Sequence, residues 1–118
     1  MKKIYISGRI SGLPIEVARG RFAAAEAYLR ERYPDAEIYN PTKFCRYEPG
    51  KPWQDYMHLC LSVLEQCDFL VLLPNWLESN GAQCEYYYAR GLHLAIYHYA
   101  QIKNGTPDPA QQLLTPNS

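Results

Sequence analysis

The sequence predicts a single-domain α/β fold, a doubly wound three-layer sandwich of the flavodoxin or Rossmann type, and three observations support this class. Residues 67–73 form a short apolar run without alternation, which is typical of a strand that helices cover on both faces. Segments with helical spacing precede and follow this run, at residues 53–66 and 81–93. Turn residues follow each of the first three predicted strands. Strands that alternate with helices favour a mainly parallel sheet, here of four to five strands.

The first predicted strand and helix occupy the N-terminal part of the chain. Residues 3–7 alternate weakly and end in a glycine-containing turn at residues 7–12, as expected for a strand followed by a loop. Residues 15–32 then show the spacing of an amphipathic helix, and Pro34 ends it. The apolar stripe of this helix is Ile15, Ala18, Phe22, Ala25 and Leu29, and the charged residues displaced from the stripe are Glu16, Arg21, Glu26 and Arg30.

The rest of the chain continues the alternation of strands and helices. Residues 37–39 form a short second strand, and residues 40–52 form a loop rich in Pro, Gly and Lys that we expect to cover part of the molecule. The remaining predicted elements are a helix at 53–66, the apolar strand at 67–73, a helix at 81–93 and a last strand at 94–99. We expect one domain over residues 1–102 and a loosely ordered tail over residues 103–118, where Asn, Gly, Pro, Gln and Thr dominate.

Composition and charge limit the classes of partner. The chain has 118 residues, 47% of them hydrophobic, which is enough for one ordinary core. Twelve basic and twelve acidic residues cancel, so no overall field attracts a nucleic acid polymer or an anionic membrane. The N-terminus has only Ile4, Tyr5 and Ile6 before its first turn, too short for a secretory segment, and no apolar run approaches membrane length. We therefore expect a cytoplasmic protein.

The four cysteines show no pattern of a redox or zinc motif. Cys45, Cys60, Cys67 and Cys84 form no C-x-x-C pair, and two of them lie within apolar patterns, which favours reduced, buried thiols. His58 beside Cys60 does not provide the close ligand pairs of a structural zinc site. We expect neither a metal ion nor another cofactor.

Segments that follow the three predicted strands should meet at one edge of the sheet, where ligands of parallel α/β proteins bind. The first of these loops, at residues 7–12, offers backbone N–H groups, hydroxyls and a guanidinium, which suit a phosphate or a carboxylate. It lacks the spacing of a P-loop or of a dinucleotide-binding loop, so neither an ATPase nor a dehydrogenase is supported. A plain tight turn has the same composition. The side chains expected at this edge are Ser7, Arg9, Ser11, Asn40, Trp76, Ser79 and Glu85.

Glu85 is the candidate reactive group at this edge, because it is expected in the first turn of the helix that follows the apolar strand. Acidic residues in a first turn commonly do no more than complement the helix dipole on an exposed surface. However, Glu85 lies three residues from Ala82, four from Ala89 and seven from Leu92, so it should project from the face that meets the sheet. Asn80 and Gln83 resemble a capping box that would fix the helix start. A carboxylate on this inner face should be functional or paired.

Several short motifs occur in a fixed order between residues 3 and 93. They are Lys3–Gly12 (KIYISGRISG), Asn40–Pro41, Trp53–Met57 (WQDYM), Cys67–Asp68, Leu72–Trp76 (LLPNW) and Ser79–Glu85 followed by Ala89. Each motif alone is weak, but their combined order is specific. With these motifs the sequence resembles the nucleoside 2-deoxyribosyltransferase-like proteins and, among them, the small phage and bacterial domains of the DUF4406 type.

This resemblance implies chemistry at an N-glycosidic bond. In the family, the glutamate that matches Glu85 is the nucleophile that attacks C1′ of a deoxyribose, and the tyrosine that matches Tyr5 helps to position it. The glycine-rich first loop and the serine that matches Ser79 contact the 5′ end of the sugar or a 5′-phosphate. The strand ends and the resemblance together give these expected substrate-binding residues: Ser7, Gly8, Arg9, Ser11, Gly12, Asn40, Cys60, Trp76, Ser79 and Gly81.

One position departs from the family pattern and leaves two functions open. Family members usually carry an aspartate on the second helix, eight residues before the match of Asp68, and this chain has Cys60 there. A thiol is a weak hydrogen-bond donor and a poor substitute for a carboxyl group. The first function is hydrolysis of, or deoxyribosyl transfer from, a 2′-deoxynucleoside or its 5′-monophosphate. The alternative is a non-catalytic protein that binds a nucleotide to sequester or sense it.

The expected partners follow from the same reading. A small-molecule nucleoside or nucleotide is the expected ligand under either function, and neither a nucleic acid polymer nor a membrane is expected. The resemblance also implies a homodimer or a larger homo-oligomer. Tyr86–Tyr88 and Trp53 are candidates for its interface, because Tyr and Trp are common interface anchors.

Overall fold

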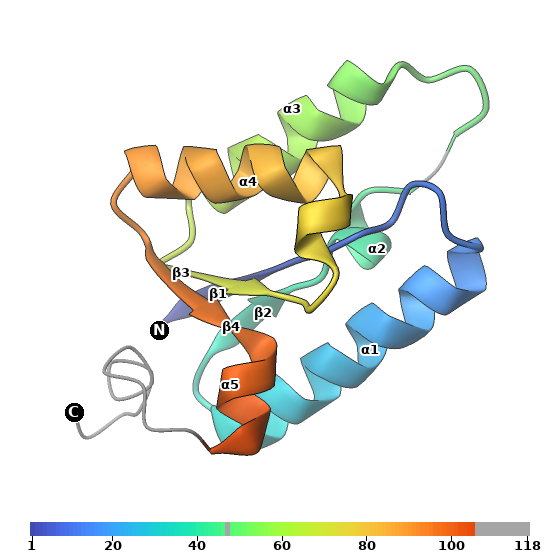
Figure 1. The fold of residues 1–118 in the computed structure, drawn as a ribbon. Helices are drawn as coiled ribbons and strands as arrows, with labels where there is room; N and C mark the ends of the chain where they lie inside the picture. The colour runs from blue at the N-terminus through green and yellow to red at the C-terminus, as the bar shows by residue number, and fades with distance from the viewer. Residues whose placement is uncertain (47, 106–118) are drawn as a thin grey trace.

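The computed structural model describes residues 1–46 and 48–105 and confirms an α/β fold built on one parallel sheet (Figure 1). In chain order the elements are β1 (Lys3–Ser7), α1 (Ile15–Arg32), β2 (Glu37–Tyr39), α2 (Pro41–Phe44), α3 (Trp53–Leu64), β3 (Phe69–Leu72), the 3-10 helix η1 (Trp76–Glu78), α4 (Asn80–Gly91), β4 (Ala95–His98) and α5 (Tyr99–Asn104). Within these residues the sheet has four strands in the order β2-β1-β3-β4, and all neighbours are parallel.

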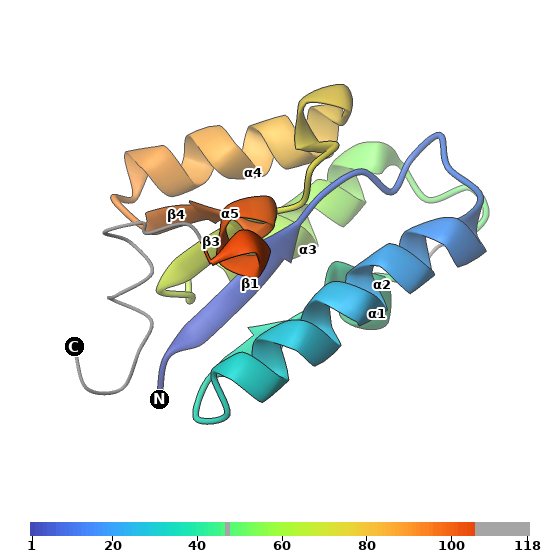
Figure 2. The same cartoon turned by 60° about the horizontal axis from the view of Figure 1, so that its bottom comes forward.

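Helices cover both faces of the sheet and give the predicted three layers. α1 and α5 lie on one face, and α3 and α4 lie on the other (Figures 1 and 2). β1 contributes to both cores, because alternate side chains of a strand point to opposite faces. Ile4 and Ile6 pack with α1, whereas Tyr5 packs with α3 and α4. All four residues of β3 are buried, as the apolar run at 67–73 predicts.

Two short helices differ from the prediction. α2 stands at the start of the segment that the sequence predicts as a loop, because Asn40 caps it and Pro41 occupies its first turn. α5 begins within the predicted strand 94–99, so that β4 ends at His98. α5 reaches Asn104, past the predicted domain boundary, and residues 106–118 of the predicted tail lie outside the described residues.

The strand order places a switch point between β1 and β3. After β1 the chain runs through α1 to β2 on one side, and after β2 it returns through α3 to β3 on the other side of β1. Ligands of open α/β sheets bind at such a point, beyond the carboxyl ends of the strands. In this fold the point is flanked by the end of β1 and by the segment that joins β3 to α4.

Candidate active site

Glu85 on α4 has its carboxylate buried against β1, with 5% of the residue exposed. The Tyr5 hydroxyl donates a hydrogen bond to Oε2, and Ser7 Oγ donates a hydrogen bond of 2.7 Å to Oε1. Tyr5 and Ser7 share one face of β1 because they are two residues apart. The prediction that Glu85 faces the sheet is confirmed. Its predicted place in the first helical turn is wrong, because α4 begins at Asn80 and Glu85 stands in the second turn.

The surroundings of Glu85 bring its titration into the neutral range. Burial raises the pKa of Glu85 from 4.5 to about 7, and the hydrogen bonds from Tyr5 and Ser7 oppose that rise because they favour the charged form. For Tyr5, burial and then the charge of Glu85 raise the pKa well above 10. At neutral pH the pair therefore consists of a protonated phenol and a carboxyl group close to its titration midpoint.

Cys60 on α3 lies beside this pair and is buried, with 7% of the residue exposed. Burial first, and then the charge of Glu85, raise the pKa of Cys60 to about 12. The structure thus brings Cys60 together with Tyr5 and Glu85, as the sequence predicts. At neutral pH the thiol is protonated, so it supplies no second negative charge.

The Arg9 guanidinium, in the loop after β1, contacts backbone carbonyls of its own loop and a nearby carboxylate. Its Nε donates to the carbonyl of Ser11 at 3.2 Å, and its Nη2 donates to the carbonyl of Gly12 at 3.5 Å. Its Nη1 lies 3.6 Å from Oε2 of Glu78, which is largely exposed on η1. A ligand anion at Arg9 would have to compete with Glu78. The Ser11 hydroxyl belongs to an exposed residue, and the recorded contacts of Ser11 and Gly12 with Arg9 use their backbone carbonyls.

Local structure explains why Gly8 and Gly12 in this loop are glycines, without a bound ligand. A Cβ on Gly8 would lie 2.9 Å from Cδ1 of Leu73, which is closer than real Cβ contacts, so a side chain there would force the Leu73 side chain to shift. Gly12 has a φ of +85°, a left-handed conformation that favours glycine. Their presence is therefore explained by packing and turn geometry.

The start of α4 is fixed by Ser79. Its Oγ accepts a hydrogen bond of 3.1 Å from the Ala82 N–H, which makes Ser79 the N-cap. The predicted capping box of Asn80 and Gln83 is wrong. Gln83 Nε2 instead donates to the carbonyl of Leu77 at 2.6 Å. The N-cap takes part of the hydrogen-bonding capacity of the Ser79 hydroxyl, which retains its own O–H as a donor.

Trp76 lies in the segment that joins β3 to α4, and Gly81 lies at the start of α4. The Trp76 ring is half-buried and lies 4.7 Å, centroid to centroid, from Tyr86 and 6.3 Å from His98. A Cβ on Gly81 would lie 3.3 Å from Sδ of Met57 on α3. Gly81 therefore allows α3 and α4 to approach closely, and Trp76 packs toward β4.

Asn40 is occupied by structural contacts at the end of β2. Its Oδ1 accepts hydrogen bonds from the backbone and hydroxyl of Thr42, and its Nδ2 donates to Glu26 Oε1 at 3.1 Å. Glu26, whose charge the helical pattern displaces from the apolar stripe, is 5% exposed and is buried beside Arg30 and Lys43. The sequence gives little signal for this, because the Glu26 partners other than Arg30 lie 14 and 17 residues away.

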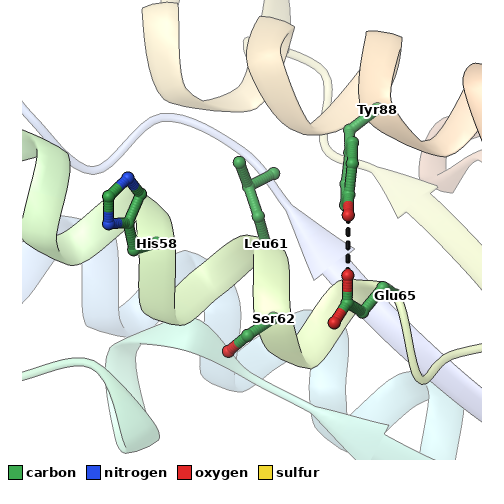
Figure 3. Close-up of a pocket in the computed structure, with 5 residues that line it drawn as sticks. All are labelled: His58, Leu61, Ser62, Glu65 and Tyr88. Carbon is green, nitrogen blue, oxygen red and sulfur yellow. Dashed lines mark hydrogen bonds between the residues drawn. The ribbon is translucent and has the colours of Figure 1, made fainter.

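A surface pocket of about 260 Å³ lies between α3 and α4 (Figure 3). Its lining residues are His58, Leu61, Ser62, Glu65 and Tyr88. The Tyr88 hydroxyl on α4 donates to Glu65 at 2.6 Å and so joins α4 to the end of α3. No residue of the pocket bonds to the Glu85 carboxylate in the recorded contacts. The candidate site is therefore the buried group around Glu85.

Two classes of feature are absent from residues 1–46 and 48–105. No group of three or more His, Cys, Asp or Glu side chains is arranged to hold a metal ion there. No helix of that part of the chain is long and apolar enough to cross a lipid bilayer.

Comparisons with known proteins agree with this architecture. The solved structure of 2-desoxiribosyltransferase from Leishmania mexicana is similar with a TM-score of 0.62 and 17% sequence identity, over 83% of this chain and 63% of that chain. The chain thus spans just under two thirds of that protein, and the likeness confirms a nucleoside 2-deoxyribosyltransferase-like fold. A search of curated proteins gives no match. The family model DUF4406, described as a domain of unknown function, matches residues 2–98, and the chain therefore belongs to the DUF4406 family.

Proposed function

We propose that this protein cleaves the N-glycosidic bond of a 2′-deoxynucleoside or its 5′-monophosphate, with Glu85 as the nucleophile. The observation that carries the proposal is the Glu85 carboxylate, buried at the switch point of the sheet and bonded by Tyr5 and Ser7. A buried carboxyl group with a pKa of about 7 is the kind of perturbed group that active sites contain. The similar fold of the 2-desoxiribosyltransferase supports the substrate class.

The proposed reaction has two steps at C1′ of the sugar. A Glu85 oxygen attacks C1′ through an oxocarbenium-like transition state, the C1′–O bond forms, and the bond to the base nitrogen breaks with its electron pair. Tyr5 and Ser7 each donate to a different oxygen, and each carboxylate oxygen keeps a further lone pair for attack. Water or another base then attacks C1′ and releases Glu85. The two donors would hold the carboxylate in one orientation throughout.

Departure of the base also requires a proton, and the described site is poor in suitable acids. The pKa of Tyr5 lies well above 10 and that of Cys60 lies near 12, so neither group matches neutral pH as a general acid. We therefore expect slow turnover, with the proton supplied by solvent or by a group on the substrate. This feature favours the second candidate function, a nucleotide-binding protein that keeps the site without turnover.

Chromatographic detection of free base tests the proposal. Wild-type protein and Glu85→Gln are incubated with a panel of 2′-deoxynucleosides and their 5′-monophosphates. Release by the wild type, at least a hundredfold above Glu85→Gln, supports glycosidic chemistry at Glu85. Equal release by both proteins rejects Glu85 as the nucleophile. No release, together with ligand-dependent thermal stabilisation of the wild type, supports the binding function.

A Cys60→Asp variant separates the two candidate functions. It places a carboxyl group beside Tyr5 and Glu85, where it could protonate the base or contact the sugar. If the pocket serves catalysis, the variant should release base faster than wild type. A variant that binds the same ligands and gains no rate would favour the binding function.

A further inference from the structure

Glu26 is a buried carboxylate that the proposed reaction does not use. It lies on the α1 face of the molecule, with 5% of the residue exposed. Arg30 Nε lies 2.7 Å from its Oε2, and Lys43 Nζ lies 3.0 Å from each of its oxygens. Burial alone would raise the pKa of Glu26, but hydrogen bonds from Arg30, Asn40 and Lys43 lower it below 4.5. Glu26 is therefore charged at neutral pH and fully engaged.

The partners of Glu26 include both ends of α2. Asn40 is the N-cap of α2 and donates to Glu26 at 3.1 Å, and Lys43 stands in the last turn of the same helix. A helix of four residues has no stability of its own, because nucleation is unfavourable at that length. Its position must come from tertiary contacts. Glu26 supplies two of these, and it joins α2 to the middle of α1.

The helix α2 in turn contacts the candidate site. Phe44, its last residue, packs edge-on against the Tyr5 ring with centroids 6.1 Å apart and planes at 64°. Tyr5 is completely buried, and its hydroxyl bonds to Glu85. A continuous series of contacts thus runs from Glu26 through α2 and Phe44 to Tyr5 and Glu85.

We infer that Glu26 is a positioning residue for the Tyr5–Glu85 pair, acting through α2 and the Phe44 ring. The charge of Glu26 holds α2 against α1, and α2 holds Phe44 against the Tyr5 ring in the orientation that directs the hydroxyl to the carboxylate. The contact series is independent of any substrate. Only its consequence for catalysis rests on the proposed function.

The direct test is a pH titration of the Glu85 carboxyl group in the free protein. ¹³C NMR monitors the titration, and the Glu85→Gln protein identifies the Glu85 signal, because that signal is missing from its spectrum. The titratable groups facing Glu85 are Tyr5 on β1 and Cys60 on α3, and both stay protonated near pH 7. The bond from Tyr5 lowers the pKa of Glu85. In a Glu26→Gln protein, the pKa of Glu85 should therefore lie about half a unit or more above its value in the wild type.

Two further variants complete the test. Glu16→Gln removes an exposed charge from the first turn of the same helix and should leave the Glu85 titration unchanged. Phe44→Leu keeps an apolar side chain and removes the ring contact, so it should raise the pKa of Glu85. This variant keeps the test possible if Glu26→Gln does not fold. Unchanged Glu85 titration in a folded Glu26→Gln or Phe44→Leu protein would overturn the inference and leave Glu26 a purely stabilising role.

The same set of variants distinguishes a failure of this inference from a failure of the proposed function. If the wild type releases no base from any substrate but Glu26→Gln shifts the titration, the proposed function fails and the positioning role stands. If the wild type is active and the titration does not shift, the positioning role fails alone. If the wild type is active, Glu26→Gln should also move the pH profile of kcat/KM to higher pH, by the same number of pH units as the pKa of Glu85.

Discussion

At Glu85, burial and hydrogen bonding act on the pKa in opposite directions and burial prevails, whereas at Glu26 the hydrogen bonds prevail. Burial disfavours the charged carboxylate, whereas Tyr5 and Ser7 donate to it and favour that form. The result is a pKa of about 7, at which a modest change in pH converts the neutral acid into a nucleophile. The two donors therefore control how much reactive carboxylate exists at neutral pH.

The pH profile of kcat/KM tests this balance. Because attack on C1′ requires the carboxylate, kcat/KM should rise with pH and level off above about 7. Ser7→Ala removes one donor to the charged form, so its profile should move to higher pH. A profile that falls through pH 7, or that Ser7→Ala does not move, would contradict this account.

Loss of the Tyr5 hydroxyl should reduce the rate. Hydrogen bonds to charged groups contribute about 1.5–3 kcal/mol, so Tyr5→Phe should lower kcat/KM by about 10- to 100-fold at a pH where Glu85 is ionised. Tyr39→Phe, on the neighbouring strand β2, is the matched control and should retain activity. Steady-state kinetics at pH 8.5 makes the comparison. Equal rates for wild type and Tyr5→Phe would remove Tyr5 from the mechanism.

Glu85 and Glu26 show what a sequence can predict about buried charges. The inner position of Glu85 follows from its spacing to Ala82 and Ala89, which are both buried. Glu26 follows Ala25 directly and lies four residues beyond Phe22, but the presence of a charge there favours the solvent side. Its burial depends on Asn40 and Lys43, which only the folded chain brings close. Long-range polar pairs of this kind have no local pattern.

Among the elements, β1 and α4 determine the geometry of the site. β1 presents Tyr5 and Ser7 on one face, and α4 presents Glu85 at a height set by where the helix begins. That start is fixed by Ser79 rather than by the predicted Asn80, because residue 79 has extended φ and ψ and its hydroxyl reaches the Ala82 N–H. A shift of one residue in the cap would rotate Glu85 by about 100° around the helix axis.

Loss of this cap should destabilise the protein. Ser79→Ala leaves the Ala82 N–H without its side-chain acceptor and should lower the free energy of unfolding by about 1 kcal/mol. Ser62→Ala removes an exposed hydroxyl on α3 that donates to its own helix, and it should change stability by less than about half of that amount. Urea denaturation measures both variants. Equal losses would show that the cap has no special role.

The helices α2 and α5 show the limits of local patterns for whole elements. Each has six residues or fewer, too short for a hydrophobic period to develop. α5 is fixed by the burial of Ile102 in the core on the α1 face, a contact between distant parts of the chain. The longer elements α1, α3 and α4 and the apolar strand β3 were predictable, because each carries a full period or an uninterrupted apolar run.

For the molecule as a whole, the alternation of strands and helices predicts the parallel sheet and its three layers, and the structure confirms both. The order β2-β1-β3-β4 and the resulting switch point are consistent with the predicted edge site. The contacts within this edge were less predictable. Several residues expected to bind substrate, among them Asn40, Gly8 and Arg9, have structural contacts of their own.

The raised pKa of Glu85 should also make global stability depend on pH. Its folded-state pKa of about 7 exceeds the ordinary 4.5, so the folded protein binds the proton more tightly. This contribution to stability is fully present below about pH 4.5 and is lost as the pH rises through 7. The loss should amount to roughly 3 kcal/mol.

Thermal and urea unfolding between pH 4 and pH 8.5 measure this dependence. Glu85→Gln cannot ionise at this position, so its stability should lack the decline that the wild type shows between pH 4.5 and about 7. The difference between the two proteins isolates Glu85 from other titrating groups. Parallel curves for the two proteins would mean that Glu85 titrates alike in the folded and unfolded states.

The most direct measurement of the central claim is intact-protein mass spectrometry after incubation with a 2′-fluoro-substituted deoxynucleoside. The fluorine destabilises the oxocarbenium-like transition state, which slows release of a covalent sugar from the enzyme. Wild type should gain the mass of one fluorinated sugar, peptide mapping should place it on Glu85, and Glu85→Gln should gain none. A sugar attached to another residue, or a wild type that consumes the nucleoside without forming an adduct, would contradict the assignment of Glu85 as the nucleophile.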